Sequence, residues 1–337
     1  MSERYEDGRY SGFDLIGDVH GCADALAELL DRLGYIRRGG VFQHRDSRRP
    51  RQALFLGDII DRGSQIRETA LLVQAMVERG HARIVLGNHE HHALAYSTPD
   101  GAGGFLREHN ERHARLIAET LEQFAHHRHD WQDCLRWFMD MPLLLEVRTA
   151  QSEFRVIHAC WDGVLVEEFK ELRPALRLDA DFLRDSVRRG SFAERFLRRA
   201  TRGLDLPLPD EQVITGLDGL PRRSFRCKFW VDAPKTYADL EFQPDRLPPA
   251  LARRRLGEAE RSQLVYYDER QPPLFIGHYW QQGVPQPLRA NLACLDYSAV
   301  KGGRLVAYRM DGERELRADK FVWVDGLSRL RYEYPDG

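Results

Sequence analysis

Five short turns in the sequence carry side chains that bind divalent metal ions. In chain order they offer Asp18 and His20, then Asp58, then Asn88 and His89, then His158, then His278. Carboxylate, imidazole and amide groups suit Mn, Fe or Zn, and no cysteine pair is spaced to supply thiolates for a structural zinc. A single carboxylate that lends one oxygen to each of two ions would set the separation of about 3.5–4 Å used by two-metal hydrolases. Asp58 lies in the middle of the series, so we expect it to be that bridge.

Most of these turns directly follow a run of apolar residues. The segment 13–21, FDLIGDVHG, is typical of a short strand entering a glycine-bounded turn, and residues 23–35 have apolar side chains at helical spacing. ALFLGD at 53–58 and ARIVLGNHE at 82–90 repeat the strand and turn, with a second helix expected over 67–80. Strands that alternate with helices predict a mainly parallel or mixed sheet with its site at the carboxyl ends of the strands.

The segments between these turns complete the outline of the fold. Residues 37–52 are polar and predict a loop or an exposed hairpin, whereas 103–140 has helical periodicity. The segment 142–161 is typical of a hairpin whose second strand ends at His158. Apolar strands return in 271–327 and would complete the core, so we predict a single domain over residues 1–337.

The composition favours a folded enzyme of no extreme charge. The 337 residues are 42% hydrophobic and 30% charged, and the formal net charge is −2. Because no strong field attracts an anionic partner, we expect neither a membrane nor nucleic acid as a partner, except nucleic acid as a terminal-phosphate substrate. The five cysteines are scattered, and the polar N-terminus lacks an apolar targeting segment. We therefore expect a cytoplasmic protein, and its oligomeric state stays open.

Three short blocks carry a resemblance to a known family. GDVHG, GDIIDRG and GNHE lie in that order within residues 17–90. Together they resemble the signature blocks of the calcineurin-like metallophosphoesterase superfamily. The DRG sequence is similar to the branch of serine/threonine phosphoprotein phosphatases and bacterial diadenosine tetraphosphatases. The resemblance implies an α/β fold, a four-layer α/β/β/α metallophosphoesterase sandwich with an inserted lid segment. HACW around His158 and LDYS at 295–298 depart from the usual pattern of that branch.

The resemblance also implies a role for each residue of the turns. It assigns one metal ion to Asp18, His20 and Asp58, and a second to Asp58, Asn88, His158 and His278. His89 would be the general acid, oriented by Asp61, whose carboxylate would raise the pKa of the imidazole. Arg62 would bind phosphate oxygens. The expected cofactors are two divalent ions, with Mn first and Fe or Zn as alternatives.

Other histidines are more typical of solvated surface. His91 and His92 follow the expected acid directly, and we expect them at the exposed start of a helix. The segment AHHRHD at 125–130 has spacing that suits a metal, but an exposed helix or helix end is the better interpretation.

A long segment, residues 162–270, separates two expected ligands of one metal ion. His158 and His278 are 120 residues apart, so the chain between them must leave the core and return beside the site. We expect this segment to fold as a lid that selects the substrate, because a structureless loop of that length is uncommon in a compact domain. Its alternating run from Ser224 would show basic side chains on one face, and Arg223 and Arg226 are candidate phosphate ligands.

The motifs specify the reaction better than the substrate. The leading hypothesis is hydrolysis of phosphate monoesters, in a phosphoprotein or a small phosphorylated molecule, by a metal-bridging water. The alternative is hydrolysis of dinucleoside polyphosphates or nucleic-acid terminal phosphates, which would require a surface for base stacking. A catalytically dead binding module is the third hypothesis, and the complete set of motif residues argues against it.

Overall fold

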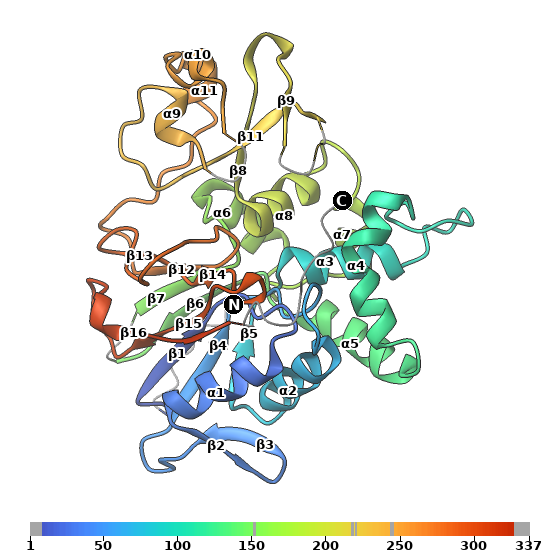
Figure 1. Ribbon diagram of the computed structural model, residues 1–337, viewed down its shortest axis with the longest axis vertical. Coiled ribbons are helices and arrows are strands. Elements are labelled where there is room, and N and C mark those ends of the chain that lie inside the picture. Colours follow the sequence, from blue (N-terminus) through green and yellow to red (C-terminus); the bar gives the residue numbers. More distant parts are fainter. Residues whose placement is uncertain (1–8, 151–152, 217–218, 220, 243–245, 327–337) are drawn as a thin grey trace.

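The structure, a computed structural model, describes residues 9–150, 153–216, 219, 221–242 and 246–326 (Figure 1). Its larger sheet has six strands in the order β14-β15-β1-β4-β5, with β16 also paired to β15. β1, β4 and β5 are parallel, and β15 joins β1 in antiparallel register. The bounds are β1 (Gly12–Ile16), β4 (Arg51–Phe55), β5 (Ala82–Ile84), β14 (Asp296–Tyr297), β15 (Arg304–Met310) and β16 (Phe321–Asp325).

The second sheet has four strands in the order β13-β12-β7-β6. They are β6 (Leu144–Arg148), β7 (Glu153–Ile157), β12 (Leu274–Ile276) and β13 (Leu292–Cys294). β6 and β7 form the antiparallel hairpin predicted for 142–161, and β12 lies parallel to both β7 and β13. The sequence analysis predicted that strands in 271–327 complete the core. These strands contribute to both sheets.

A purely apolar layer fills the space between the two sheets. Alternate residues of each strand point into it, as the two-residue period of a strand requires. Leu15 and Leu54 come from the larger sheet, and Val156 and Phe275 come from the smaller one. The intervening residues, such as Ile16 and Ile157, belong instead to the cluster that contains the outer helices.

Helices cover the outer faces of both sheets. α1 (Ala23–Leu33) packs against β15 and β16, and α2 (Ile66–Glu78) packs against β5. On the other side, Lys170 of α6 (Gly163–Leu172) pairs with Glu146 of β6 at 2.8 Å, and Phe169 stacks on Phe196 of α8 (Phe192–Arg202). The order helix, sheet, sheet, helix is the predicted four-layer α/β/β/α fold, which is confirmed.

The remaining elements lie around this sandwich. β2 (Tyr35–Arg38) and β3 (Val41–His44) form an exposed hairpin, the second of the alternatives for 37–52, at the bottom of Figure 1. Four more helices lie beside the sandwich: α3 contacts both α5 and the short helix α7, and α4 contacts α2. Their bounds are α3 (Asn88–Ser97), α4 (Glu111–Gln123), α5 (Arg128–Asp140) and α7 (Ala180–Asp185).

The segment 162–270 is divided between the sandwich and a separate lobe. The sequence prediction assigned all of it to a lid, but α6 and α8 bury apolar faces against the smaller sheet and form the fourth layer. Only the part from β8 onward leaves the sandwich, at the top of Figure 1. Its elements are β8 (Leu204–Pro207), β9 (Ile214–Thr215), β10 (Pro221–Arg222), β11 (Ser224–Cys227), α9 (Tyr237–Leu240), α10 (Pro249–Ala252) and α11 (Glu258–Arg261).

Three single-turn 3₁₀ helices complete the described secondary structure. They are η1 (Pro209–Glu211), η2 (Ala299–Lys301) and η3 (Ala318–Lys320). Among all the helices of the described residues, none has the length and apolar character needed to cross a membrane.

Candidate active site

The turns singled out in the sequence all lie at the carboxyl ends of strands in the two sheets. Asp18 and His20 follow β1, Asp58 follows β4, and Asn88 begins α3 just after β5. From the smaller sheet, His158 follows β7 and His278 follows β12. Because these ends meet at one edge of the sandwich, side chains from five separate segments are brought to one place.

The backbone of these turns is held in unusual conformations. Among the non-glycine residues with positive φ are His20 at 45°, Asp58 at 50° and His278 at 60°. Such conformations cost free energy and tend to gather at functional sites. Two glycines permit the close approach, since a Cβ on Gly87 would lie 2.2 Å from Oδ1 of Asp58 and one on Gly277 would lie 2.0 Å from Oδ1 of Asp18.

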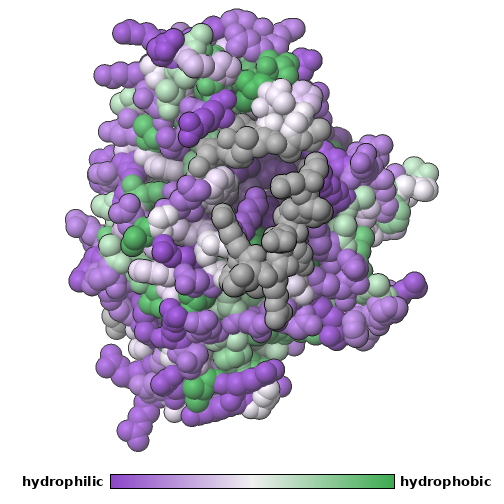
Figure 2. All heavy atoms as spheres, viewed as in Figure 1, coloured by the Kyte–Doolittle hydropathy of each residue, from purple (hydrophilic) through white to green (hydrophobic). Residues whose placement is uncertain are grey.

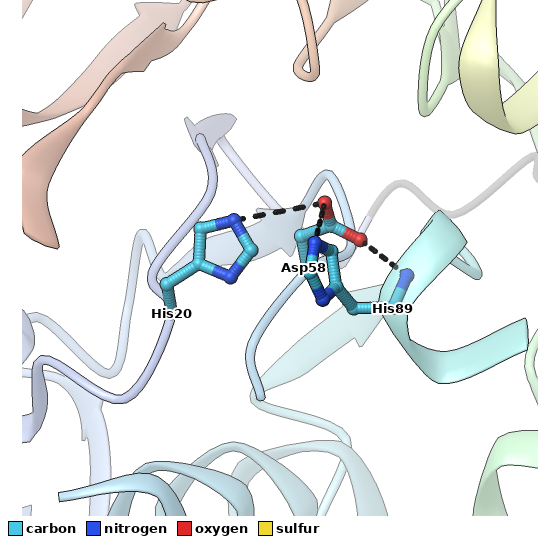
Figure 3. Close-up of side chains that lie close together, drawn as sticks. All are labelled: His20, Asp58 and His89. Atoms are coloured by element: carbon cyan, nitrogen blue, oxygen red, sulfur yellow. Dashed lines mark hydrogen bonds and ion pairs between the residues drawn. The ribbon is translucent and has the colours of Figure 1, made fainter. Parts of the chain in front are cut away.

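Asp58 lies at the centre of the constellation (Figure 3). Its Oδ2 is 3.7 Å from Nε2 of His20, 3.9 Å from Nε2 of His89 and 3.3 Å from Nε2 of His158. Its Oδ1 accepts the backbone N–H of His89 at 3.0 Å. Burial alone would raise the pKa of Asp58, but the charges of His158, His89 and His20 and the hydrogen bond from His158 together hold that pKa well below its usual value. The carboxylate is therefore a buried anion that needs positive charge beside it.

Two histidines direct Nε2 at Asp58 because their other ring nitrogen is already engaged. Nδ1 of His20 donates to the carbonyl of Ile60 at 2.8 Å, and Nδ1 of His158 donates to the carbonyl of Leu56 at 2.6 Å. Nε2 of His158 holds a proton beside Asp58 in this structure, and a bound metal ion would take the place of that proton. A backbone carbonyl on the far nitrogen is the usual arrangement of a metal-binding histidine, so these residues fit a divalent ion.

Asn88 and His278 complete a second group around His158. Ligand atoms of Asp58, His158 and His278 all lie within 4.8 Å of one another. The side-chain amide atom of Asn88 that faces them is 3.2 Å from Nε2 of His158 and 2.7 Å from Nδ1 of His278. Nε2 of His278 is buried without a hydrogen-bond partner among the described residues. With the amide oxygen on that side, three neutral electron-pair donors converge beside a carboxylate, which is a donor set suited to a divalent ion.

Asp18 lies beside this group with a different set of contacts. Its carboxylate accepts the backbone N–H of His278 at 3.2 Å, and it belongs to neither cluster of mutually close ligand atoms. Burial, followed by the charge of Asp296, raises its pKa well above the usual value. The cluster that includes His20 and Asp58 contains His89 in its place.

The predicted acid, its orienting carboxylate and the predicted phosphate ligand form a connected chain. Nδ1 of His89 and Oδ2 of Asp61 are 2.5 Å apart, and the hydroxyl of Thr120 donates to the other oxygen of Asp61. Nη2 of Arg62 lies 3.0 Å from Nε2 of His89. Asp61 and its neighbours thus fix the plane of the imidazole and direct Nε2 toward the exposed guanidinium.

The predicted increase in the pKa of His89 is wrong. Burial lowers the pKa of His89 to about 3, with Asp58 opposing and Arg62 reinforcing this change. Burial also raises the pKa of Asp61 to about 7. A carboxyl group this deeply buried gives the imidazole less electrostatic support than an exposed one, since its own charged form is disfavoured.

Glu90 is a site residue that the sequence reasoning missed. It is fully buried, and its carboxylate accepts the backbone N–H groups of Asp58 and Ile59, each at 2.9 Å, and of Gly87 at 3.1 Å. It therefore joins the turn after β4 to the start of α3. Its position as the last residue of GNHE was the sequence feature that could have indicated it as a site residue. A glutamate in the first turn of a helix is common, however, because it interacts favourably with the helix dipole.

Two further charged residues reach the site although they were not predicted as site residues. Asp296 is buried, and its charge acts on Asp18. Arg202, at the end of α8, lies in the electrostatic environment of both His89 and His278 and helps to lower the pKa of each. The LDYS segment contains Asp296 and was the available signal for it, whereas only the fold brings Arg202 to the site.

Of the two arginines predicted on the lid, only Arg226 is close to the site. Its guanidinium lies 5.9 Å from the ring centre of Tyr279, the neighbour of His278, and its charge helps to lower the pKa of His278. Arg223 is exposed, and no hydrogen bond or ion pair in the described part of the chain links its side chain to the site. The alternation from Ser224 occurs as predicted, with Phe225 and Cys227 buried.

The prediction that His91 and His92 are solvated is wrong. Both are buried, with Nε2 of His91 at 2.8 Å from the hydroxyl of Ser186 and Nε2 of His92 at 3.2 Å from the carbonyl of His113. α3 packs against α5 and α7, and its residues from Asn88 to Tyr96 are all buried, so polar residues are buried there despite the absence of an apolar stripe. His126, His127 and His129, in the 125–130 segment, are exposed as predicted.

A comparison of the sequence with known protein families agrees with the function that this geometry suggests. The family model described as calcineurin-like phosphoesterase matches residues 13–199, more than half of the chain. The chain belongs to this family. Enzymes of the family act with a dinuclear metal site, and Asp58 with its surrounding histidines supplies candidate ligands for one.

Similar proteins include bis(5'-nucleosyl)-tetraphosphatases of bacteria. The one from Halalkalibacterium halodurans is 48% identical over 77 residues, and that from Bacillus subtilis is 39% identical over 77 residues. Each match covers 23% of this chain and 30% of the relative, so the chain spans under a third of the length of these relatives.

Solved structures of phosphatases are also similar to this structure. A serine/threonine phosphatase from Saccharomyces cerevisiae has a TM-score of 0.47 at 14% identity, covering 98% of this chain and 82% of its own. A cold-active protein-tyrosine phosphatase from a Shewanella species has a TM-score of 0.47 at 18% identity, covering 94% and 82% respectively.

Proposed function

We propose that this protein is a dinuclear metal-dependent phosphoesterase that hydrolyses phosphate monoesters, in a phosphoprotein or a small phosphorylated molecule. The observation that carries the proposal is the position of Asp58 between two groups of donors. His20 belongs to one group, and His158 and His278 belong to the other. Nε2 of His20 and Nε2 of His158 both face Oδ2 of Asp58. A carboxylate in this position can share its oxygens between two ions.

The residues that would hold the metal ions follow from these contacts. Asp18, His20 and Asp58 would bind one ion, and Asp58, Asn88, His158 and His278 would bind the other. Asn88 enters this assignment through its proximity to His158 and His278, whereas Asp18 enters it through the GDVHG motif. When bound, two divalent ions would supply an activated water as nucleophile and balance charge on the phosphoryl group. Mn is the first expectation for this hard and intermediate donor set, with Fe or Zn as alternatives.

The protein's own residues would bind the phosphoryl group and supply a proton. Arg62 is exposed beside the site, where its guanidinium would bind two phosphate oxygens in a fork. A phosphate held there would lie next to His89, because Nη2 of Arg62 is 3.0 Å from Nε2 of His89. His89 would deliver a proton from Nε2 to the leaving oxygen, while Asp61 on Nδ1 keeps the ring in position. The negative charge of the bound phosphate would favour protonation of a ring that is otherwise neutral.

Two more arginines would extend the positive surface around the phosphate. Arg202 and Arg226 both act on His278 through their charge, and the charge of Arg226 helps, after burial, to lower the pKa of Arg202. Buried or partly buried like charges are costly unless an anion binds between them. Arg226 therefore remains a proposed phosphate ligand from the lobe, whereas the position of Arg223 gives it no comparable support. Selection of the substrate by this lobe likewise stays a proposal.

A second candidate function is hydrolysis of dinucleoside polyphosphates. The relatives named bis(5'-nucleosyl)-tetraphosphatase favour it, although they match over 77 residues only. The same residues would serve this reaction, because a phosphoanhydride also breaks by attack of water at phosphorus. Hydrolysis of nucleic-acid terminal phosphates and a cytoplasmic location remain predictions of the sequence.

A substrate panel tests both candidates. Protein stripped with EDTA and then supplied with Mn²⁺, Fe²⁺ or Zn²⁺ would be assayed on p-nitrophenyl phosphate, a phosphopeptide, diadenosine tetraphosphate and a 3′-phosphorylated oligonucleotide. The proposal expects activity to depend on added metal. Metal-independent turnover of all four substrates would contradict it, and the ranking of kcat/KM would choose between monoester and anhydride.

A further inference from the structure

The turn that carries Asp61 and Arg62 has a backbone conformation that depends on its surroundings. The φ angle is 66° at Asp61 and 70° at Arg62, so two neighbouring non-glycine residues lie in the left-handed region. Such conformations cost free energy and persist where the surrounding structure fixes them. The start of the turn is fixed by Glu90 and by the N–H of Gly21, which both bond the backbone of Ile59. From Asp61 onward, a second set of contacts comes from α4.

The inward face of α4, at the right of Figure 1, meets this turn. Ile117 and Thr120 are the buried residues of the helix, and Gln123 follows at the same spacing of three. Residues three apart lie on one face of a helix, so these side chains point in a similar direction. Two of the three are polar, which is unusual for a face that packs against other helices.

Thr120 makes two hydrogen bonds with Asp61. Its hydroxyl accepts the backbone N–H of Asp61 at 3.1 Å and donates to Oδ1 of the same residue. The other carboxylate oxygen, Oδ2, is 2.5 Å from Nδ1 of His89. Thr120 therefore fixes the backbone of Asp61 and the plane of its carboxylate together. Because that carboxylate orients the imidazole, the position of His89 depends on a residue of α4.

The hydroxyl of Thr120 is not needed for packing. The face of the molecule in Figure 2 is mostly hydrophilic, as expected where polar groups can bind water. Thr120 is instead fully buried, so its hydroxyl must be bonded within the protein. Valine has nearly the same shape and could be buried without that requirement. The hydrogen bonds to Asp61 are thus the specific contribution of threonine at this position.

Gln123 binds the backbone on the other side of Arg62. Its Nε2 donates to the carbonyl of Gly63 at 2.9 Å, and its Oε1 accepts the N–H of Ile66 at 2.6 Å. Ile66 is the first residue of α2, where an N–H has no partner within its own helix. An amide side chain has both the donor and the acceptor that these two contacts require. Gln123 therefore fixes the path of the chain directly after Arg62, whose Nη2 is 3.0 Å from Nε2 of His89.

We propose that Thr120 and Gln123 are positioning residues of the active site, Thr120 for the acid His89 and Gln123 for the phosphate ligand Arg62. This inference rests on the proposed phosphoesterase function. It adds two residues of α4, outside the turns that carry the predicted site residues. The competing interpretation is that both residues support folding alone, in which case their loss would affect every substrate in the same proportion.

Leaving-group dependence tests the role of Thr120. Thr120→Val and Thr120→Ser would be assayed with Mn²⁺ on glycerol 2-phosphate and p-nitrophenyl phosphate. We expect Thr120→Val to lower kcat at least about tenfold on glycerol 2-phosphate and much less on p-nitrophenyl phosphate, because a misplaced acid matters where the leaving group needs a proton. Thr120→Ser keeps the hydroxyl and should retain most of the activity. Losses in equal proportion on the two substrates, or no loss, would overturn this role.

Two further variants complete this comparison. Thr98→Val is the matched control, since the hydroxyl of Thr98 bonds the carbonyl of Leu94 at the end of α3. It should leave the ratio of the two kcat values unchanged. If Thr120→Val does not fold, Thr120→Ala replaces it, because the smaller side chain leaves room for water beside Asp61.

Substrate affinity tests the role of Gln123. We expect Gln123→Leu to raise KM about tenfold on both substrates, with the ratio of their kcat values unchanged, because Arg62 would bind the phosphoryl group of either one. Binding of inorganic phosphate, measured by calorimetry, should weaken to a similar extent. Gln74→Leu removes an amide that bonds Glu78 on α2 and should change neither value. Unchanged KM and phosphate binding in folded Gln123→Leu would overturn this role.

Nuclear magnetic resonance tests the position of His89 without turnover. In EDTA-treated protein labelled with ¹⁵N-histidine, the proton on Nδ1 of His89 should give a downfield signal because of its short hydrogen bond to Asp61. His89→Ala identifies this signal by its loss. We expect the signal to persist in Thr120→Ser and to move or disappear in Thr120→Val. An unchanged signal in Thr120→Val would contradict the inference.

The outcomes separate this inference from the proposed function. Hydrolysis of both substrates by the wild type, with variants that lose activity in equal proportion, would retain the phosphoesterase and overturn the positioning roles. Absence of hydrolysis by the wild type would overturn the phosphoesterase. In that case a changed His89 signal in Thr120→Val, with weaker phosphate binding by Gln123→Leu, would still support the hold of α4 on the two residues.

Discussion

The carboxylate of Asp58 lies 3.3 Å from Nε2 of His158, although the two residues are 100 positions apart and belong to different sheets. Each controls the protonation of the other. Asp58 raises the pKa of His158 to about 10 against the opposing effect of burial, and His158 lowers that of Asp58. The buried carboxylate of Asp58 requires a positive charge beside it, at the junction of the two sheets. A proton on His158 or a bound metal ion can supply that charge.

Asp58→Asn should abolish both metal binding and turnover. The amide would keep the shape of the side chain but remove the charge that two ions would share. Metal content by atomic emission and Mn²⁺-dependent hydrolysis of p-nitrophenyl phosphate measure the two effects. Asp46→Asn, on the exposed turn after β3, is the matched control and should retain both. Full activity of Asp58→Asn with bound metal would refute the bridging role.

His89→Ala should lose about 10²–10⁴ in kcat on substrates whose leaving group needs a proton, while keeping its metal ions. The loss should be smaller on p-nitrophenyl phosphate, because p-nitrophenolate leaves without much protonation. The comparison requires kcat for an alkyl phosphate and for p-nitrophenyl phosphate on the same preparation. Equal losses on both substrates would argue that His89 does not act as the acid.

Glu90→Ala should destabilise the protein and weaken metal binding together. The change leaves buried N–H groups of Asp58, Ile59 and Gly87 without their acceptor, and each unsatisfied donor costs about 1–3 kcal/mol. Urea unfolding and a Mn²⁺ titration measure the two effects. Glu78→Ala, at the end of α2, should change neither. Unaltered metal affinity in a clearly destabilised Glu90→Ala would show that this residue supports folding alone.

Arg51→Ala should reduce the free energy of unfolding by about 3–5 kcal/mol without a direct effect on catalysis. Arg51 donates to both oxygens of the fully buried Asp14, at 3.0 and 3.1 Å. Without the guanidinium, the buried carboxylate has less positive charge and fewer hydrogen bonds to offset its removal from water. Arg45→Ala removes an exposed pair with Asp31 at 3.7 Å and should cost about 0–1 kcal/mol. Similar unfolding midpoints for the two variants would contradict this difference.

Arg226→Ala can be compared with Arg223→Ala, because Arg226 lies on β11 and Arg223 directly precedes this strand. Arg226 acts on His278, so its loss should raise KM for the true substrate with a smaller change in kcat. Arg223 is exposed and should behave as the wild type. Steady-state kinetics on the substrate panel measure both. An effect of Arg223→Ala as large as that of Arg226→Ala would show that the lobe binds substrate in another way.

The sequence by itself determined the strands and the polar residues that end them. A run such as ALFLGD specifies a buried strand through its apolar residues and a turn through Gly57, so the place of Asp58 at a strand end follows from local physics. Local pattern also predicted the 142–161 hairpin and the alternation that buries Phe225 and Cys227. The GDVHG, GDIIDRG and GNHE blocks then identified the family.

Only the tertiary structure decided which distant groups share one environment. The burial of His91 and His92 and the contacts of Glu90 depend on helices and turns packed around α3, which no residue within α3 specifies. The sequence analysis assigned α6 and α8 to the lid, because whether an apolar helix face covers a sheet or a metal site depends on the partner surface. The hold of α4 on the turn at Asp61 has the same origin, because Thr120 lies 59 positions from Asp61 in the chain. Local interactions select secondary structure within a few residues, whereas burial, charge and long-range hydrogen bonds arise from segments that the chain brings together only when it folds.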